Sequence, residues 1–319
     1  MHAPLPVIVQ GLGPIGRLIA EAALADPFLE VVGAVEIRPE LAGRPLSDFV
    51  DGAPEVAVRP TLAEAVADSG SAGGIVLHCT GSYLDRVAPQ IEEALRQGLH
   101  VVSTCEELTF AEARHAEIAA TLDRLARGAQ RTVVATGVNP GFLMDALPAS
   151  LASISHSIRS VVVRRVQDPS RRRTPFQQKV GMDLSPEEWE ERRAAGGFGH
   201  VGLTESARLL AAALGWTLVD WQHEMVPCRA ERQDLVTGTL ETLEGSTSDG
   251  RTVRLHFEAN AAVAEEYDEI VVDGTPPLTL RFEGGVFGDD ATVAAVLRAA
   301  RVIPNTRRGL ATVLDLPLR

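Results

Sequence analysis

Short apolar runs alternate with amphipathic stretches over the first 140 residues of the chain. The runs lie at residues 7–9, 31–35, 75–79, 101–103 and 132–135. The stretch after the first run has the spacing of a single helix face, with apolar residues at positions 15, 18, 19, 22 and 23. Strands that alternate with helices predict a parallel sheet covered by helices on both faces.

The pattern changes after residues 139–141. Ser185, followed by proline and then by Glu188, is typical of a helix start closed by a capping box. Strand signals beside turns lie at residues 252–257, 269–272 and 278–282. The chain is therefore expected to be α/β, with an N-terminal doubly wound parallel sheet followed by a C-terminal α+β domain with a mostly antiparallel sheet.

The same change gives the expected domain boundaries. Residues 1–140 are predicted to form the parallel-sheet domain and residues 141–290 the α+β domain, with a cleft between them. The helix and tail of residues 291–319 are predicted to return to the first domain. A length of 319 residues agrees with two domains. Because antiparallel sheets are common subunit contacts, we expect a homodimer by analogy.

Composition argues against several classes of partner. The formal net charge of -13 disfavours nucleic acid and anionic membranes, which both attract basic surfaces. No apolar run reaches membrane-spanning length. The three cysteines and eight histidines show no metal-ligand spacing, so we expect no metal. Unpaired cysteines suit a reducing compartment, and we expect the protein to be cytoplasmic.

A glycine-rich turn follows the first predicted strand. It consists of Gly11, Leu12, Gly13, Pro14, Ile15 and Gly16. Its first glycine permits a tight turn, the second lets the backbone approach a pyrophosphate, and the third lets the helix pack on the sheet. The helix N-terminus adds unpaired N–H groups and a partial positive charge. The turn therefore predicts a Rossmann domain that binds a nicotinamide dinucleotide.

Two charged residues after the second predicted strand bear on the choice of cofactor. Glu36 is placed to accept hydrogen bonds from the ribose hydroxyls and to repel a 2′-phosphate, which favours NAD. Arg38 lies two residues further on and would pair with that phosphate instead. We therefore expect NAD or NADP as cofactor, with NAD preferred.

Polar residues follow the next two predicted strands. They are Thr80, Gly81 and Ser82 after one strand, and Ser103, Thr104, Cys105, Glu106 and Glu107 at the end of the other. Ligands of open α/β sheets bind at the carboxyl ends of the strands. Both segments are therefore expected to line the cofactor, the second one closer to the nicotinamide.

Adjacent carboxylates are unusual at this position in a dehydrogenase of alcohols, which needs a lysine or histidine as its acid/base. The single lysine is Lys179, and no histidine is expected close to this strand end. Glu106 or Glu107 would hold an ammonium ion, or take its proton so that ammonia attacks a carbonyl. Alternatively, the two residues begin a helix and complement its dipole. Spacing alone does not separate these readings.

Motifs spread over nearly the whole chain share one resemblance. They lie at residues 11–16, 101–108, 137–142, 165–168, 172–173, 178–181, 199–206 and 315–317. In these segments the chain resembles the family of 2,4-diaminopentanoate dehydrogenases and native NAD(P)-dependent amine dehydrogenases. The N-terminal domain of that family is similar to that of dihydrodipicolinate reductase.

The resemblance implies reductive amination of a ketone or aldehyde by ammonia and NAD(P)H, and the reverse oxidative deamination of an amine. It also implies a glutamate near the nicotinamide as acid/base residue, which maps onto Glu106 or Glu107. Asn139 would help to place the nicotinamide.

Substrate contacts are expected where the chain leaves the first domain and on one face of a later strand, since Arg165 and Gln167 are two residues apart. The expected contacts are Pro140, Phe142, Arg165, Gln167, Phe176, His200 and Phe287. Where the family is expected to have a histidine, this chain has Phe287. The missing imidazole predicts a more apolar pocket, and a substrate without a second amine or carboxylate.

Three other functions stay open. A reductase of a preformed cyclic imine would not need free ammonium. A dehydrogenase of hydroxy compounds is disfavoured by the absence of a lysine or histidine beside the carboxylates. A sensor that binds NAD(P)H without catalysis is favoured slightly by Phe287.

Overall fold

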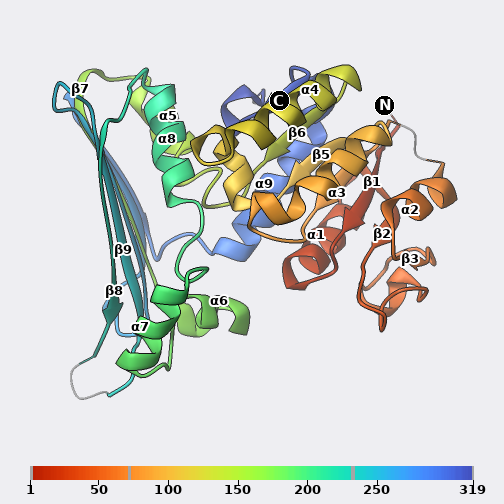
Figure 1. Ribbon diagram of the computed structural model, residues 1–319, viewed down its shortest axis with the longest axis horizontal. Coiled ribbons are helices and arrows are strands. Elements are labelled where there is room, and N and C mark those ends of the chain that lie inside the picture. The colour runs from red at the N-terminus through yellow and green to blue at the C-terminus, as the bar shows by residue number, and fades with distance from the viewer. Residues whose placement is uncertain (1–2, 71–72, 231–233, 318–319) are drawn as a thin grey trace. The chain divides into compact units, whose positions relative to one another are not determined.

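The chain forms two compact units in the computed structural model, which describes residues 3–70, 73–230 and 234–317. The first unit contains Met1–Phe142 together with Gly288–Arg319. The second unit is the continuous segment Leu143–Phe287. Within the first unit, Figure 1 shows the segment after residue 287, in blue, among the N-terminal elements.

A parallel sheet of seven strands forms the centre of the first unit. Its strands are β1 (Leu5–Gln10), β2 (Leu29–Val35), β3 (Val58–Arg59), β4 (Ile75–His78), β5 (His100–Ser103), β6 (Thr132–Ala135) and β13 (Gly309–Ala311). Their order in the sheet is β13-β6-β5-β4-β1-β2-β3, and every neighbouring pair is parallel. The predicted parallel sheet is confirmed, with the short edge strands β3 and β13 in addition.

Helices cover both faces of this sheet. They are α1 (Pro14–Leu24), α2 (Leu62–Ser69), α3 (Leu84–Arg96), α4 (Ala116–Gly128) and α9 (Gly288–Val302). Val7 and Val9 of β1 point into an apolar cluster with α1 and α9. Ile8, between them, points into a second cluster with α2, α3 and α4. Alternate residues of a strand thus pack against different helices, as expected for a buried sheet.

A mixed sheet of six strands forms the second unit. Its strands are β7 (His156–Gln167), β8 (Asp220–Cys228), β9 (Gly238–Ser246), β10 (Thr252–Asn260), β11 (Tyr267–Thr275) and β12 (Leu278–Glu283). The order is β12-β11-β7-β10-β9-β8. Only the β7–β10 pair is parallel among these strands, so the predicted mostly antiparallel sheet is confirmed.

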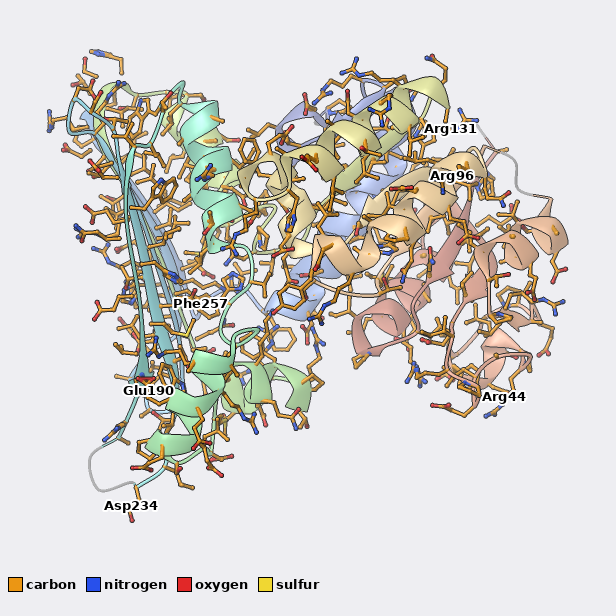
Figure 2. The ribbon with its side chains drawn as sticks, viewed as in Figure 1. Arg44, Arg96, Arg131, Glu190, Asp234 and Phe257 are labelled. Carbon is orange, nitrogen blue, oxygen red and sulfur yellow. The ribbon has the colours of Figure 1, made fainter. Side chains whose placement is uncertain are left out.

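The helices of the second unit are α5 (Ala146–Ala152), α6 (Thr174–Lys179), α7 (Pro186–Ala195) and α8 (Leu203–Ala213). The helix α5 packs on β7 and β11, and α8 packs on β9 and β10. Phe257 of β10, labelled in Figure 2, is buried. The predicted capping box of Ser185 and Glu188 at the start of α7 is confirmed.

Short 3-10 helices lie in the connections: η1 (Leu46–Asp48), η2 (Glu106–Ala113), η3 (Pro169–Arg171), η4 (Ile303–Asn305) and η5 (Val313–Asp315). Within the described ranges, no helix combines the length and the apolar composition that a membrane span requires.

Candidate functional site

The glycine turn joins β1 to α1 and has an open side. Gly11 has φ +94°, a conformation that favours glycine, and a Cβ on Gly16 would lie 1.8 Å from the Gly11 carbonyl oxygen. A Cβ on Gly13 would meet no atom of the described residues within 4 Å. No described side chain caps the N-terminus of α1. The turn therefore leaves room and free N–H groups, and so fits the pyrophosphate of a dinucleotide.

The Glu36 carboxylate is bound to this turn. Its Oε2 accepts hydrogen bonds from the Leu12 N–H at 2.9 Å and from the Arg38 guanidinium at 3.0 Å. Its Oε1 accepts from the backbone N–H groups of Ile37 and Arg38. Four donors fill the usual acceptor positions of a carboxylate. To bind Glu36, a ribose hydroxyl would therefore have to share an acceptor position with one of these four donors or displace it. The sequence alone does not show that these positions are filled.

Ionisation of Glu36 is favoured by these bonds. Burial raises the pKa of the Glu36 carboxyl, but hydrogen bonds from Arg38 and Leu12 outweigh it and hold the pKa below its ordinary value. The Arg38 side chain is 44% exposed, and its guanidinium also donates to the Leu12 carbonyl oxygen at 2.9 Å. Arg38 is thus both tied to the turn and open to solvent.

Arg38→Ala is expected to weaken binding of NADPH and to leave binding of NADH unchanged or stronger. The variant removes the cation available to a 2′-phosphate and frees one acceptor position on Glu36. Loss of one charge-assisted hydrogen bond predicts a roughly tenfold or larger rise in the Kd for NADPH. Titration calorimetry with both cofactors measures the effect. An equal loss for NADH and NADPH would contradict this role of Arg38.

The segments after β4 and β5 lie side by side. The Thr104 N–H donates to the His78 carbonyl oxygen at 2.9 Å, and the Glu107 N–H donates to the Ser82 carbonyl oxygen at 3.3 Å. Residues 80–82 and 103–107 therefore meet at the carboxyl edge of the sheet, where the glycine turn also lies.

Glu106 and Glu107 have different surroundings at the start of η2. Glu107 is 6% exposed, and its Oε2 accepts from the Leu84 N–H at 2.8 Å. The same oxygen lies 2.9 Å from Nε2 of His115. Glu106 is half-buried. The inference that no histidine is close to the carboxylates is wrong, because η2 turns the chain so that His115 faces Glu107.

Two buried histidines in β4 and β5 are expected to make stability depend on pH. Burial lowers the pKa of His78 and of His100 to about 4, from an ordinary value of 6.5. Between these values the unfolded chain takes up more protons than the folded one. The free energy of unfolding should therefore fall as the pH drops from about 6.5 to 4, by about 3 kcal/mol for the fully buried His78.

Urea unfolding at several pH values measures this dependence. In the parent protein, the Thr132 N–H donates to His100 Nδ1 at 3.1 Å. The His100→Asn variant keeps an acceptor for this N–H and removes one titrating group. The variant should show a shallower dependence than the parent protein over the same range. Equal slopes would contradict the assignment of neutral, buried histidines.

The loop after β6 carries Asn139, Pro140 and Phe142. It is tied to α9 by a hydrogen bond from the Val138 N–H to the Thr292 hydroxyl at 3.2 Å. Phe142 is 48% exposed. Because β6 is parallel to β5, this loop lies at the same edge of the sheet as Glu106.

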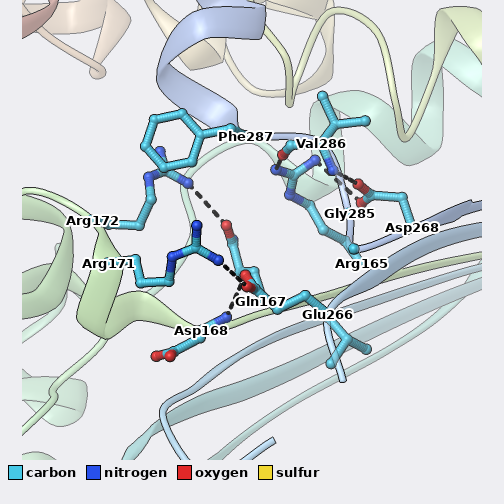
Figure 3. A pocket seen from close by; sticks show the side chains of 12 residues that line it. Arg165, Gln167, Asp168, Arg171, Arg172, Glu266, Asp268, Gly285, Val286 and Phe287 are labelled. Atoms are coloured by element: carbon cyan, nitrogen blue, oxygen red, sulfur yellow. Dashed lines mark hydrogen bonds and ion pairs between the residues drawn. The ribbon is translucent and has the colours of Figure 1, made fainter. Parts of the chain in front are cut away.

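A cavity of about 220 Å³ lies within the second unit (Figure 3). Its lining consists of Arg165, Val166, Gln167, Asp168, Arg171, Arg172, Glu266, Asp268, Gly284, Gly285, Val286 and Phe287. Three of the predicted substrate contacts, Arg165, Gln167 and Phe287, are therefore brought together. Their contact with a substrate remains a prediction.

A buried ion pair forms one wall of the cavity. Arg165 and Asp268 are 2% and 3% exposed, and Arg165 NH1 lies 3.2 Å from Asp268 Oδ1. Arg165 also donates to the Val286 carbonyl oxygen at 2.8 Å, and Asp268 Oδ2 accepts from the Val286 N–H at 2.7 Å. Burial lowers the pKa of Arg165 and raises that of Asp268, whereas their mutual attraction opposes both shifts. The pair fixes the loop that carries Phe287.

Arg172 connects the other side of the cavity to two aromatic rings. Its guanidinium carbon lies 4.6 Å from the centre of the Phe176 ring and 5.1 Å from that of Phe287. Arg172 also donates to Gln167 Oε1 at 2.9 Å. Three arginines and three carboxylates share the lining of this cavity with Phe287, so the cavity is strongly polar. The expectation that Phe287 makes the substrate pocket more apolar than one with a histidine stays a prediction.

His200 lies in a separate cluster of the second unit. Its ring stacks on Phe257 at 4.5 Å between centres, and the backbone N–H of His200 donates to Glu241 Oε2 at 2.9 Å. Burial lowers the pKa of His200 well below its ordinary value, so the imidazole is neutral. His200 is not part of the cavity lining.

The parallel sheet, the open glycine turn and the polar strand ends define a Rossmann-type dehydrogenase that binds NAD(P). The chain belongs to the 2,4-diaminopentanoate dehydrogenase family. The family model described as 2,4-diaminopentanoate dehydrogenase C-terminal domain matches residues 142–319. The resemblance inferred from the motifs is thus confirmed.

Known relatives agree with this assignment. A 2,4-diaminopentanoate dehydrogenase of Acetoanaerobium sticklandii is 26% identical over 331 residues, covering 98% of this chain and 93% of the relative. The structure of an amine dehydrogenase from Mycobacterium smegmatis matches with a TM-score of 0.86 at 21% identity, covering 100% of this chain and 98% of that one. Dihydrodipicolinate reductase from Paenisporosarcina sp. TG-14 shares the fold at a TM-score of 0.56 and 14% identity, covering 98% of both chains. The protein is therefore an oxidoreductase of this family.

Proposed function

We propose that the protein is an NAD(P)-dependent amine dehydrogenase. It would aminate a ketone or aldehyde reductively with ammonia, and in reverse deaminate an amine oxidatively. The observation that carries this proposal is a half-buried carboxylate, Glu106, at the carboxyl edge of the sheet that holds the glycine turn. Family membership and the similarity to an amine dehydrogenase support the same chemistry.

The first unit supplies the residues that would hold the cofactor. They are Gly11, Leu12, Gly13, Pro14, Ile15, Glu36, Arg38, Thr80, Gly81, Ser82, Ser103, Thr104 and Asn139. The bound nicotinamide supplies a hydride in the reductive direction and accepts one in reverse. NAD is proposed as the preferred cofactor, since Glu36 is held ionised beside Leu12 and would repel a 2′-phosphate.

Glu106 is proposed as the acid/base residue. As a carboxylate it would take a proton from an ammonium ion, so that neutral ammonia can attack the carbonyl carbon. As a carboxylic acid it would return that proton to the hydroxyl group, which leaves as water. Glu107 is less suited, because its carboxylate already binds the Leu84 N–H and His115 inside the protein.

Two further points belong to the proposal. The carbonyl or amine substrate would contact Arg165, Gln167 and Phe287, which line the cavity of the second unit. The protein is proposed to be a homodimer, by analogy with other antiparallel sheets that form subunit contacts. Analytical ultracentrifugation tests the second point.

Cofactor oxidation with a panel of ketones and aldehydes tests the function. The protein is mixed with NADH or NADPH and ammonium at about pH 9, where a useful fraction of the ammonium is deprotonated. Oxidation that requires both the carbonyl compound and ammonium is the expected result. Oxidation with a preformed cyclic imine in the absence of ammonium would assign a reductase instead. Binding of NADH without any turnover would favour a sensor.

A further inference from the structure

A buried polar network joins β4, β5 and α3 beside the proposed acid/base residue. His78 is the last residue of β4 and is 1% exposed. It pairs in register with Ser103, the last residue of β5, and its Nδ1 lies 2.8 Å from the Ser103 hydroxyl. Its Nε2 lies 2.9 Å from Gln90 Oε1 and 2.9 Å from the Thr80 hydroxyl.

The hydrogen bonds of this network have one consistent direction. Gln90 Oε1 accepts from the Thr80 hydroxyl at 2.7 Å and also lies 2.9 Å from His78 Nε2. Because two lone pairs would repel at that distance, Nε2 carries the proton and Nδ1 has the lone pair. The Ser103 hydroxyl therefore donates to Nδ1. The Ser103 oxygen in turn accepts the backbone N–H of Cys105 at 3.0 Å. The imidazole is thus connected through one hydroxyl to the backbone immediately before Glu106.

Glu106 lies between two anchored neighbours. On its N-terminal side, Cys105 is held through Ser103 and His78. On its C-terminal side, Glu107 is held by the Leu84 N–H and His115, and its own N–H donates to the Ser82 carbonyl oxygen. Both anchors fix the backbone on either side of Glu106, whose side chain is half-buried.

We propose that His78 is a positioning residue: through the Ser103 hydroxyl it holds the Cys105 N–H and thereby fixes the turn that carries Glu106. This inference rests on the proposed function of Glu106. A neutral imidazole suits the task, because its one acceptor nitrogen and one donor nitrogen fix the direction of the network. Small displacements of an acid/base group are costly to a reaction, since proton transfer needs hydrogen-bond contact.

Three variants test the proposal in the full-length protein, with ammonium-dependent oxidation of NADH as the activity. His78→Phe removes the acceptor, and Ser103→Ala removes the hydroxyl. Each is expected to lower kcat, measured at saturating NADH, about tenfold or more, with the KM for the carbonyl compound changed by less than about threefold. His78→Asn places an amide oxygen near the position of Nδ1 and should recover most of kcat.

The double variant His78→Phe with Ser103→Ala shows whether the two residues act as one unit. Its kcat should equal that of the less active single variant, because both substitutions interrupt the same hydrogen-bonded connection. His100→Asn, at the opposite end of β5, is the matched control for a buried histidine and should retain full kcat.

Two results would overturn the proposal. One is a kcat within twofold of the parent for folded Ser103→Ala, and the other is a loss in the double variant equal to the product of the single losses. If His78→Phe does not fold, the kcat of Ser103→Ala alone is sufficient to test the proposal. Failure of the proposed function is distinguishable, since the parent protein itself would then show no ammonium-dependent turnover, and the positioning role would fall with it.

Discussion

Glu106→Gln is expected to lower kcat for ammonium-dependent turnover about 10²- to 10⁴-fold, the usual contribution of a general acid/base residue. Glutamine has nearly the same shape as glutamate but does not ionise at neutral or alkaline pH, so it cannot act as a general acid or base. The Kd for NADH, measured by fluorescence titration, should change by less than about twofold. The separation of a lost rate from an intact cofactor site identifies Glu106 as an acid/base residue rather than a cofactor ligand.

Glu107→Gln is the matched control. Its carboxylate binds the Leu84 N–H at the start of α3 and His115, so its loss should lower stability by about 1.5–3 kcal/mol. Folded Glu107→Gln protein should lose far less kcat than Glu106→Gln, at most about tenfold, because the glutamine amide oxygen still accepts the Leu84 N–H and the backbone bond from the Glu107 N–H to the Ser82 carbonyl oxygen is unchanged. If Glu107→Gln lost turnover while Glu106→Gln kept it, the assignment of the two carboxylates would be reversed.

Asp268→Ala is expected to destabilise the second unit by about 3–5 kcal/mol, because it leaves the buried guanidinium of Arg165 without its carboxylate. Scanning calorimetry measures the effect as a lower Tm of the transition that belongs to this unit. A protein with two compact units can unfold in more than one thermal transition, so each calorimetric peak must be assigned to its unit. The loop at Val286 also loses a hydrogen bond in this variant, which acts in the same direction.

Two comparisons test whether burial is the cause. Asp273→Ala breaks an ion pair with Arg159 in the same β7–β11 strand pair, but the two side chains are 42% and 70% exposed. That variant should change stability by less than about 1 kcal/mol. Arg165→Met combined with Asp268→Leu replaces the buried pair by apolar groups and should recover much of the stability. Equal losses in Asp268→Ala and Asp273→Ala would contradict the argument from burial.

Local pattern was sufficient for the elements with strong periodicity. The apolar runs became β1, β2, β4, β5 and β6, and the alternation at residues 252–257 became part of β10. Strands of two or three residues leave no such signal. β3 and β13 were therefore missed, although β13 adds an edge to the parallel sheet beside β6.

Contacts between distant parts of the chain explain the remaining differences. The partner of Arg165 lies 103 residues away, and that of His78 lies 25 residues away in the next strand of the sheet. Residue types at these positions suggest nothing about their pairing until strand order and register are known. The saturation of Glu36 by four donors is hidden for the same reason, since one donor comes from the turn after another strand. The glycine turn, by contrast, was predictable because its whole function is local.

The discontinuity of the first unit has a consequence for synthesis. The apolar cluster on one face of its sheet needs Val296 and Leu297 of α9, and the sheet edge needs β13, so this unit lacks core residues until residues beyond 287 have left the ribosome. The second unit is encoded without interruption between residues 143 and 287. During translation, the second unit can therefore complete its folding first. The dinucleotide-binding first unit can do so only after residues beyond 287 have been synthesised.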